Sequence, residues 1–518
     1  MATGAYEVVP LPVLLRQRAA SMPDRVFVED VDGGSLTYAG TYELAQRWAR
    51  RFRQLGIGAG DRVATFIPNS VESVSVWLGL ALLRAIEVPV HPAFRGRMIV
   101  HAVTSVGARV VVADPAWSER IAEVQAELDG VEHTVVLGDV DLGEADGGDE
   151  VPHQWDIANI IYTSGTTGPS KGVEIRWTQL CVSAMRTFPF EDLNEDDVFY
   201  VFTPASHVGA KILPYLAALV GGRAVVRPEF KMDQFLPDVR RFGITTAPII
   251  GAIPHFLAQS APAPDDATIP LRNLVMAPMV PDLEGFKRRF GVRVCTAYNM
   301  TELSIPFTSN GWEIDDWTSV GRLQPGWPFY EARLVDEHDY EVPTGEVGEL
   351  VLRTGEPWAL TSGYFGVPAA TAEAWRNGWL HTGDAFRRDD QGRFYFIDRM
   401  KDTIRRRGEN VSSFEVESMV NEYPAVFESA AIAVPAETSE DEIKILIVVK
   451  PERAFDPRGL IEFLIPRMPR FMIPRYVEVV DELPKTIGTA RTKKLELRAR
   501  GNTEATWDRV AAGVVLPR

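Results

Sequence analysis

Cysteine is scarce in this chain, because its 518 residues include only two, Cys181 and Cys295. They are far apart in sequence, and neither belongs to a CxxC or metal-ligand spacing. A disulfide framework and a cysteine metal site are therefore not expected. The sequence predicts a reduced protein, which favours a cytoplasmic location.

A long hydrophobic run is also missing. No apolar stretch is long enough to span a bilayer, so we expect no stable membrane insertion. The N-terminal segment "MATGAYEVVPLPVLLRQRAA" lacks the basic region and apolar run of a signal peptide, and it is typical of an amphipathic helix instead. The final residues, "VVLPR", carry no peroxisomal signal.

Positive charge is in deficit, since 54 lysine and arginine residues face 71 aspartate and glutamate residues, for a net charge of -17. This balance argues against a nucleic-acid or membrane-surface binder, although it is compatible with local basic patches for anionic ligands. The hydrophobic content of 46% is ample for large cores, and the length exceeds one ordinary domain. The composition does not decide between a monomer and a homo-oligomer.

The sequence does contain a regular alternation of short apolar runs with helical patterns. Residues 62–68 and 87–92 are typical of buried strands, and the segment between them, 70–85, is typical of a helix. The rhythm returns at 108–115 and at 243–259. It predicts an α/β protein with parallel-rich sheets covered by helices.

The pattern changes near residue 390, where a β-rich segment leads into a basic turn. The residues after this turn alternate apolar strands with helices, which is enough for a small α+β domain. We predict an N-terminal domain over 1–398, which includes a β-subdomain, and a mobile C-terminal domain over 399–518, with a hinge near Lys401. The acidic, glycine-rich stretch 138–154 is expected to be a surface loop of the first domain.

The most distinctive motif is "IANIIYTSGTTGPSKGVEI", residues 157–175. A strand pattern leads into a loop of hydroxyl and glycine residues, and a helical pattern is expected after the loop. Glycines let backbone N–H groups converge on an anion, while hydroxyls add donors and the lysine adds a cation. The Walker pattern GxxxxGK[ST] is not met, because Ser170 stands at its second glycine and Gly172 follows the lysine. The candidate phosphate-binding residues are Thr163, Ser164, Gly165, Thr166, Thr167, Gly168 and Lys171.

This loop and four later stretches, "AYNMTE", "GWLHTGD", "DRMKD" and "LPKTIGTARTKKLELR", resemble the adenylate-forming superfamily of acyl- and aryl-CoA synthetases, luciferases and peptide-synthetase adenylation domains. The resemblance covers nearly the whole chain. Residues 398–417, "DRMKDTIRRRGENVSSFEVE", are most similar to acyl-CoA ligases of the carnitine/crotonobetaine type. In the family reaction a carboxylate and ATP give an acyl-adenylate, and CoA then displaces AMP after the C-terminal domain rotates.

The resemblance implies a role for each matching residue of a nucleotide site. Thr163 to Lys171 would wrap the ATP phosphates, and Tyr298 would stack on adenine. Thr301 would contact the α-phosphate, while Glu302 and Thr163 would hold Mg²⁺ if ATP is used. The same set includes Asn299 and Met300 of this motif, and Asp384 and Arg399 at the ribose hydroxyls.

A second set of implied roles concerns the acyl group and CoA. His207 would lie at the entrance of the acyl pocket, and Lys401 would be the hinge. Gly408 would let the pantetheine arm of CoA pass, with Glu409 in the same turn. The basic run Arg405, Arg406 and Arg407 would meet the CoA phosphates. The acyl pocket would further involve Gly251, Met276 and Ala277.

The C-terminal motif departs from the family pattern, which is approximately P-[KR]-T-x-[ST]-G-K-x-x-K. Counting forward from Pro484 puts the catalytic lysine at Ala490, and counting back from the following helix puts it at Arg491. Neither residue is lysine, and Lys493 comes too late. Arginine keeps the charge, but its planar fork is bulkier than an ammonium group. Because a donor aimed at developing charge commonly matters by ~100- to 1000-fold, adenylation is expected to be weak or absent.

Three hypotheses follow from these residues. In the first, the enzyme has kept thioester formation around Gly408, takes acyl-AMP from a separate adenylating enzyme, and uses CoA with release of AMP. In the second, it is a complete ligase that needs ATP and Mg²⁺, with Arg491 or Lys493 in place of the lysine. In the third, it is a non-catalytic nucleotide- or acyl-binding regulator. The first is preferred; its partners are a small-molecule acyl substrate and CoA, no nucleic acid is expected, and the acyl group stays open.

Overall fold

The computed structural model describes residues 7–163, 170–251, 253–400, 404–406, 409–435, 441–468, 470–485 and 492–516. The chain divides into two compact units. Unit 1 comprises 1–332 and 352–380, and unit 2 comprises 333–351 and 381–518. Unit 2 therefore includes two segments that precede the predicted boundary after residue 398. The predicted hinge, Lys401, lies outside the described residues and stays a prediction.

One sheet of unit 1 has six strands among the described residues, in the order β6-β5-β3-β4-β7-β8. All neighbours are parallel except β7 and β8. Its central strands are almost wholly buried, which explains their continuous apolar sequences. The strands are β3 (Arg62–Phe66), β4 (Ile86–Pro89), β5 (Val110–Ala113), β6 (His133–Val136), β7 (Ile157–Thr163) and β8 (Lys171–Arg176).

A second sheet of unit 1 has seven strands in the described chain, in the order β13-β12-β11-β9-β10-β1-β2. Its strands pair in parallel, apart from the antiparallel pair β1 and β2 at one edge. The strands are β1 (Val26–Asp30), β2 (Gly34–Thr37), β9 (Val198–Val201), β10 (Arg223–Val226), β11 (Thr246–Ile250), β12 (Asn273–Ala277) and β13 (Arg293–Cys295). These buried parallel strands agree with the alternation of short apolar runs and helical patterns in the sequence.

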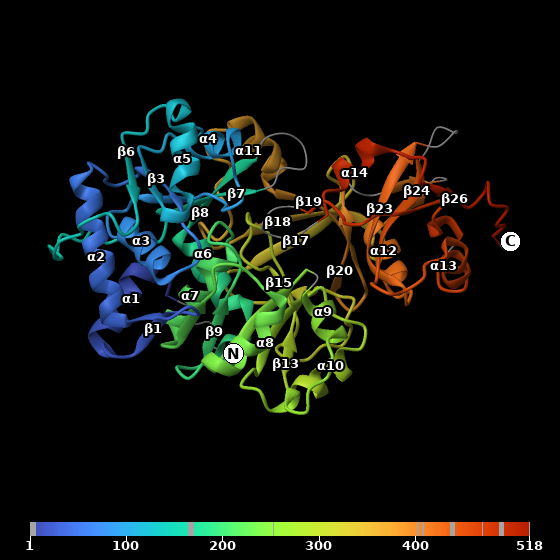
Figure 1. Ribbon diagram of the computed structural model, residues 1–518, viewed down its shortest axis with the longest axis horizontal. Helices are drawn as coiled ribbons and strands as arrows, with labels where there is room; N and C mark the ends of the chain where they lie inside the picture. Colours follow the sequence, from blue (N-terminus) through green and yellow to red (C-terminus); the bar gives the residue numbers. More distant parts are fainter. Residues whose placement is uncertain are drawn as a thin grey trace. The chain divides into compact units, whose positions relative to one another are not determined.

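Helices cover these sheets, and Figure 1 shows α1, α2 and α3 grouped together in unit 1. The helix α3 (Val71–Ala81) is apolar on nearly all sides and begins at a capping box made by Ser70 and Ser73. Gly79 allows α3 to approach α2 (Tyr38–Gln54), because a Cβ at this position would lie 2.5 Å from the Cβ of Trp48. The other helices of unit 1 are α1 (Leu11–Ser21), α4 (Arg97–Thr104), α5 (Ser118–Val124), α6 (Trp177–Thr187), α7 (Gly209–Val220), α8 (Met232–Phe242), α9 (Ile253–Gln259), α10 (Leu283–Phe290) and α11 (Pro368–Ala374).

Short antiparallel strands follow the second sheet in the chain. The strand β14 (Ala297–Tyr298) pairs with β15 (Phe307–Thr308), which pairs with β16 (Gly321–Leu323). The longer strands β17 (Tyr330–Val335) and β18 (Val347–Thr354) come next. The strands β14, β15 and β16 belong to unit 1, while β17 and β18 are each divided between the two units, so the predicted β-subdomain lies only partly in unit 1.

Unit 2 is built around a sheet with the order β23-β24-β25-β26, in which only the pair β24 and β25 is parallel. Helices pack on this sheet, and alternate residues of β23 and β24 fill its core. The elements are β19 (Leu380–Arg388), β20 (Arg393–Arg399), β21 (Ile404–Arg406), β22 (Glu409–Val411), α12 (Ser413–Asn421), β23 (Val426–Pro435), β24 (Asp441–Val449), α13 (Pro457–Leu464), β25 (Tyr476–Val479), α14 (Lys494–Arg500) and β26 (Trp507–Asp508).

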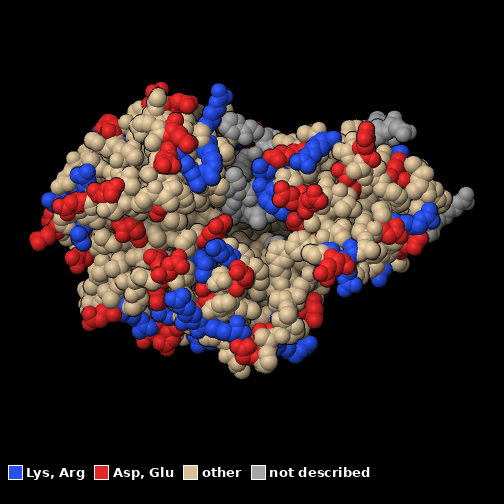
Figure 2. All heavy atoms as spheres, viewed as in Figure 1, with Lys and Arg blue, Asp and Glu red and all other residues tan. Residues whose placement is uncertain are grey.

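The structure confirms the predicted α/β class, with a large N-terminal unit of helix-covered sheets and a smaller C-terminal unit. Cys181 and Cys295 are both buried and unpaired. Within the described residues, the stretch 138–154 contains neither helix nor strand, and none of the helices has the length and apolarity needed to cross a membrane. Figure 2 shows acidic and basic side chains interspersed over the visible face of unit 1.

Candidate functional site

The predicted phosphate loop connects two strands of a β-hairpin. In the register of β7 and β8, Thr163 is the partner of Lys171, so both residues lie where the loop begins and ends. The helix expected directly after the loop is wrong, because β8 comes first and α6 begins only at Trp177. The reason is the alternation of buried Val173 and Ile175 on β8, which is a strand period and pairs with β7. Five predicted residues, Ser164, Gly165, Thr166, Thr167 and Gly168, lie outside the described residues.

The structure brings Lys171 and Glu302 together through a residue that the sequence analysis missed, Tyr364. The Tyr364 hydroxyl donates a hydrogen bond of 3.0 Å to Glu302 Oε1. The ammonium of Lys171 lies 5.0 Å from the centroid of the Tyr364 ring, within the range of a cation–π contact. The two motifs are far apart in sequence, and they meet at one tyrosine.

The backbone around Glu302 is held by α6, the helix that follows the hairpin. The fully buried amide nitrogen of Gln179 donates to the carbonyl oxygens of Thr301 at 2.8 Å and Leu303 at 3.0 Å. The N–H of Thr361 donates to the carbonyl of Glu302 itself at 3.0 Å. Gln179 was also missed, because α6 contains several other polar residues and nothing in the sequence singles this one out.

The rest of the second motif forms a tight turn after β14. Tyr298 is buried, with its ring centroid 6.1 Å from that of Phe307. The Asn299 Oδ1 atom accepts a hydrogen bond of 3.3 Å from the N–H of Ile305. The carbonyl of Met300 accepts one of 3.1 Å from Leu303. These contacts give the turn its shape, and the adenine-binding role of Tyr298 stays a prediction.

The ligand set predicted for Mg²⁺ is a single carboxylate with a hydroxyl. Among the described residues, no three His, Cys, Asp or Glu side chains gather to hold a metal ion. Magnesium usually keeps several waters and takes one or two carboxylates together with phosphate oxygens. Glu302, which is 7% exposed and oriented by Tyr364, fits that mode of binding, with Thr163 at the end of β7 as the other predicted ligand.

Two histidines lie near the predicted entrance of the acyl pocket. His207 precedes α7, and its Nδ1 accepts a hydrogen bond of 3.0 Å from the N–H of Gly209. His91 follows β4, and its Nδ1 accepts one of 3.1 Å from Ala93. Burial, helped by the nearby His207, lowers the pKa of His91 to about 4. His91 is therefore neutral at pH 7 with its proton on Nε2, and the sequence analysis did not identify it.

A buried ion pair joins the helix that follows His207 to strand β4. The Nζ atom of Lys211, four residues after His207, is 2.6 Å from Glu87 Oε2. Glu87 also accepts hydrogen bonds from Thr65 at 2.9 Å and from Asn159 at 2.7 Å. These contacts tie α7 to β3, β4 and β7, so the helix after His207 is fixed to the strand that enters the hairpin.

The other predicted pocket residues lie at the carboxyl ends of β11 and β12. Met276 is fully buried in the core of the second sheet, and its carbonyl accepts a hydrogen bond of 2.9 Å from the Thr296 hydroxyl. The carbonyl of Ala277 accepts one of 2.9 Å from the N–H of Gly251. Gly251 has a φ of 63°, which favours glycine. Pocket lining by these residues stays a prediction.

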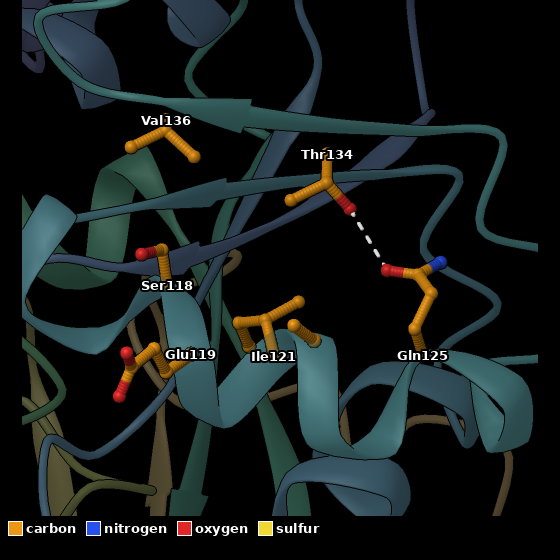
Figure 3. A pocket seen from close by; sticks show the side chains of 7 residues that line it. Ser118, Glu119, Ile121, Gln125, Thr134 and Val136 are labelled. Atoms are coloured by element: carbon orange, nitrogen blue, oxygen red, sulfur yellow. Dashed lines mark hydrogen bonds between the residues drawn. The ribbon is translucent and has the colours of Figure 1, made fainter.

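The pocket drawn in Figure 3 lies elsewhere in unit 1, between α5 and the edge strand β6. Its volume is about 270 Å³. The hydrogen bond drawn between its lining side chains in Figure 3 is the one of 3.3 Å from Thr134 to Gln125. None of its lining residues is among the predicted site residues; they are Ser118, Glu119, Ile121, Ala122, Gln125, Thr134 and Val136.

In unit 2, the two residues predicted at the ribose lie together. Arg399 Nε is 2.8 Å from Asp384 Oδ1, and Asp384 is 1% exposed. Lys401 and Gly408 lie outside the described residues, and Glu409 begins β22. One expectation is wrong: Arg406 does not face CoA phosphates, because it is buried, ion-paired with Glu442 at 2.6 Å, and bonded to the carbonyls of Phe471 and Ile473.

The described lysines of the C-terminal motif are all paired with glutamates of unit 2. Lys485 pairs with Glu428, Lys493 with Glu496 at 2.8 Å, and Lys494 with Glu417 at 2.8 Å. A β-bridge between Lys485 and Thr492 closes the loop between them. Arg491 belongs to that loop and lies outside the described residues.

Comparisons with known proteins agree with this architecture. The family model described as AMP-binding enzyme matches residues 15–365, and the one described as AMP-binding enzyme C-terminal domain matches residues 415–488. A crotonobetaine/carnitine–CoA ligase of Salmonella arizonae is 30% identical over 484 residues, which cover 89% of this chain and 92% of the relative.

Solved structures give the same result for the fold. ATP-bound MatB from Rhodopseudomonas palustris is similar with a TM-score of 0.84 at 25% identity, covering 95% of this chain and 99% of that one. The anthranilate CoA ligase AuaEII, in complex with anthranoyl-AMP, has a TM-score of 0.86 at 23% identity and covers 99% of this chain and 100% of its own. The second likeness concerns the fold alone.

Proposed function

The chain belongs to the AMP-binding enzyme family, as an acyl-CoA ligase of the adenylate-forming type, and we propose that it is specialised for the thioester-forming half reaction. In this step the thiolate sulfur of CoA attacks the acyl carbonyl carbon of an acyl-adenylate. The new C–S bond replaces the C–O bond to phosphate, and AMP leaves with the bonding electron pair. The thiol proton passes to solvent.

The proposal rests on the lysine and arginine residues of the C-terminal motif. Neither count along the family pattern puts a lysine in the catalytic position, where Ala490 or Arg491 stands. Lys485 and Lys494 are each engaged by a glutamate, and the bridge between Lys485 and Thr492 fixes the ends of the loop. Without a lysine beside the departing pyrophosphate, the charge that develops in the transition state is less stabilised. Loss of such a donor commonly lowers the rate by ~100- to 1000-fold.

The other residues take roles in binding the adenylate and CoA under this proposal. Lys171 and the hairpin loop meet the phosphate of AMP, while Tyr298 faces adenine. Asp384 and Arg399 meet the ribose, and His207 borders the acyl group. CoA enters past Gly408 and Glu409 once the chain has turned about Lys401. A separate adenylating enzyme supplies the acyl-AMP, and the reaction takes place in the cytoplasm.

A complete ATP-dependent ligase is the second candidate. It is favoured by the retention of Lys171 and Glu302 and by the names of the relatives, which describe full ligases. When bound, Mg²⁺ would supply charge neutralisation at the ATP phosphates, with Glu302 and Thr163 as its protein ligands. In that case Arg491 or Lys493 performs the role of the lysine. Lys493 carries only an exposed i,i+3 pair with Glu496, which is weak.

The two candidates differ in one half reaction, so the test measures each half by itself. The full chain is given carboxylic acids with short, long and aromatic acyl groups, together with ATP, Mg²⁺ and CoA, and pyrophosphate release is followed. In parallel it is given the synthetic acyl-adenylates of the same acids with CoA, and thioester formation is followed by mass spectrometry. A third arm measures AMP binding by calorimetry.

Thioester formation from acyl-adenylates, at a rate at least about 100-fold above the rate from acid and ATP, is the expected result. Pyrophosphate release at ordinary enzymatic speed would instead establish the complete ligase. Binding of AMP without turnover in either assay would favour a third candidate, a non-catalytic nucleotide- or acyl-binding regulator.

A further inference from the structure

Tyr364 contacts both Lys171 and Glu302 with one side chain. We propose that Tyr364 is a positioning residue that couples the phosphate-binding hairpin to the second nucleotide motif. This inference rests on the proposed function, because it assumes that the two motifs bind an adenylate. No family pattern used in the sequence analysis pointed to this tyrosine.

The position of Tyr364 is fixed by the hairpin itself. Tyr364 forms an antiparallel bridge with Val173 of β8. On one side the N–H of Phe365 donates to the carbonyl of Gly172 at 2.8 Å, and on the other the N–H of Glu174 donates to the carbonyl of Gly363 at 3.1 Å. The backbone that carries the tyrosine ring therefore moves with β8, whose first residue is Lys171.

The ring of Tyr364 contacts a cation, and its hydroxyl contacts a carboxylate. The ring face lies 5.0 Å from the Lys171 ammonium, and this contact leaves the ammonium N–H groups available for a phosphate. The hydroxyl donates a hydrogen bond of 3.0 Å to one oxygen of Glu302. Among the described residues Lys171 makes no ion pair, so the cation and the carboxylate each contact Tyr364 without being paired with each other.

Glu302 is fixed from the opposite direction by its backbone. Gln179 holds the carbonyls on both sides of it, and Thr361 holds its own carbonyl. With the backbone fixed, the orientation of the carboxylate depends on its side-chain partners. A hydrogen bond from the Tyr364 hydroxyl to a charged oxygen is one of the stronger kinds in proteins. Its loss should therefore loosen the carboxylate. Because Glu302 is the predicted ligand of a Mg²⁺ ion at the phosphate, binding of the nucleotide phosphate in the presence of Mg²⁺ should weaken.

A double-mutant cycle on AMP binding tests this coupling without relying on turnover. Tyr364→Phe removes the hydroxyl and keeps the ring, and Glu302→Gln removes the charge that the hydroxyl holds. Dissociation constants for AMP in the presence of Mg²⁺ are measured by calorimetry for the full chain, both single variants and the double variant. We expect Tyr364→Phe alone to weaken AMP binding by about tenfold. In the Glu302→Gln background the same change should cost less than about twofold.

A second cycle tests the ring contact and keeps the proposal testable if one variant does not fold. Tyr364→Leu removes the ring as well as the hydroxyl, so it should weaken binding more than Tyr364→Phe does. In a Lys171→Met background the Leu and Phe variants should be equal. Tyr38→Phe is the matched control: this buried tyrosine donates to the carbonyl of Gly222, and its hydroxyl should affect thermal stability but not AMP binding.

The outcomes separate this inference from the proposed function. An equal loss from Tyr364→Phe in both backgrounds, or no loss, would overturn the positioning role while leaving thioester formation untouched. A clear coupling in a chain that forms no thioester would support the positioning role and overturn the proposed half reaction. A wild-type chain that does not bind AMP would overturn both.

Discussion

Asp30 shows how a single half-buried carboxylate affects this protein. It ends β1, and its Oδ1 accepts a hydrogen bond of 2.9 Å from the N–H of Val71 at the start of α3. Burial raises the pKa of Asp30 to about 6, despite this hydrogen bond, and the neighbouring Asp32 and Glu72 act in the same direction. At neutral pH the folded state therefore carries a charge that its surroundings disfavour.

Asp30→Asn should stabilise the protein at pH 8 and not at pH 4. The amide oxygen keeps the acceptor for Val71, while the unfavourable charge is removed. Since the pKa is about 6 in the folded state and 3.8 for an unperturbed aspartate, the cost of the carboxylate is fully present above pH 6 and disappears as the pH falls to 3.8. We expect a gain of about 1 to 2 kcal/mol at pH 8, after allowing for partial exposure.

Thermal unfolding at the two pH values measures this gain. Asp129→Asn, at an exposed position, is the control and should change stability little at either pH. An equal effect of Asp30→Asn at pH 4 and pH 8 would show that burial of the charge is not the cause.

At the same scale, the residues of the site were predictable one by one but not in their contacts. Lys171 and Glu302 stand in recognisable motifs, so the sequence indicates both as candidates, and their roles stay predictions. Tyr364 and Gln179 belong to no motif that the sequence analysis used. Gln179 donates a hydrogen bond to a residue more than a hundred positions away, and Tyr364 to one 62 positions away. Contacts at that separation follow from tertiary structure, which neither spacing nor periodicity encodes.

At the scale of elements, the period of the apolar residues determined which helices and strands the sequence could predict. The continuous apolar runs of β3, β4 and β5 were recognised as buried strands, and α3 as a helix. The strand β8 was taken for a helix, because it is short and runs directly into α6. The alternation of Val173 and Ile175 covers too short a segment to decide alone, and the pairing of β8 with β7 establishes the strand.

The packing of α3 on α2 gives an element-scale prediction for Gly79. A Cβ at Gly79 would lie 2.5 Å from the Trp48 Cβ and 2.9 Å from the carbonyl oxygen of Ala45, so the two helices would have to separate. Gly79→Ala should therefore destabilise unit 1 by about 1 to 3 kcal/mol, although alanine favours an isolated helix. The measurement is the free energy of unfolding from urea titration.

Gly40 in α2 offers a matched control for the same substitution. A Cβ there would have its nearest contacts at 3.5 Å, which is ordinary van der Waals distance. Gly40→Ala should be neutral or stabilise the protein by up to about 1 kcal/mol. If Gly79→Ala behaved in the same way, the close approach of α2 and α3 would not matter for stability.

At the scale of the whole molecule, the chemistry is divided along the sequence. The hairpin loop and the second motif belong to unit 1, while the pair predicted at the ribose, the turn predicted to admit CoA and the C-terminal motif belong to unit 2. A change confined to the C-terminal motif can therefore remove one half reaction and leave the adenylate-binding residues unaltered. The proposed loss of adenylation therefore requires no change in unit 1.

Restoring the lysine should restore adenylation if its displacement is the cause. Arg491→Lys combined with deletion of Ala490 returns the loop to the family spacing as counted from Pro484. An ammonium in this position would again meet the charge that develops on pyrophosphate, so we expect ATP–pyrophosphate exchange to rise by at least about 100-fold with one or more of the tested acids. Arg491→Lys without the deletion should gain less, because a displacement of about 1 Å can cost ~100-fold.

Lys493→Met in the wild-type loop is the control for a register-shifted lysine. If the wild-type chain already has high exchange activity and Lys493→Met lowers it, Lys493 performs the role of the catalytic lysine. The enzyme would then be a complete ligase.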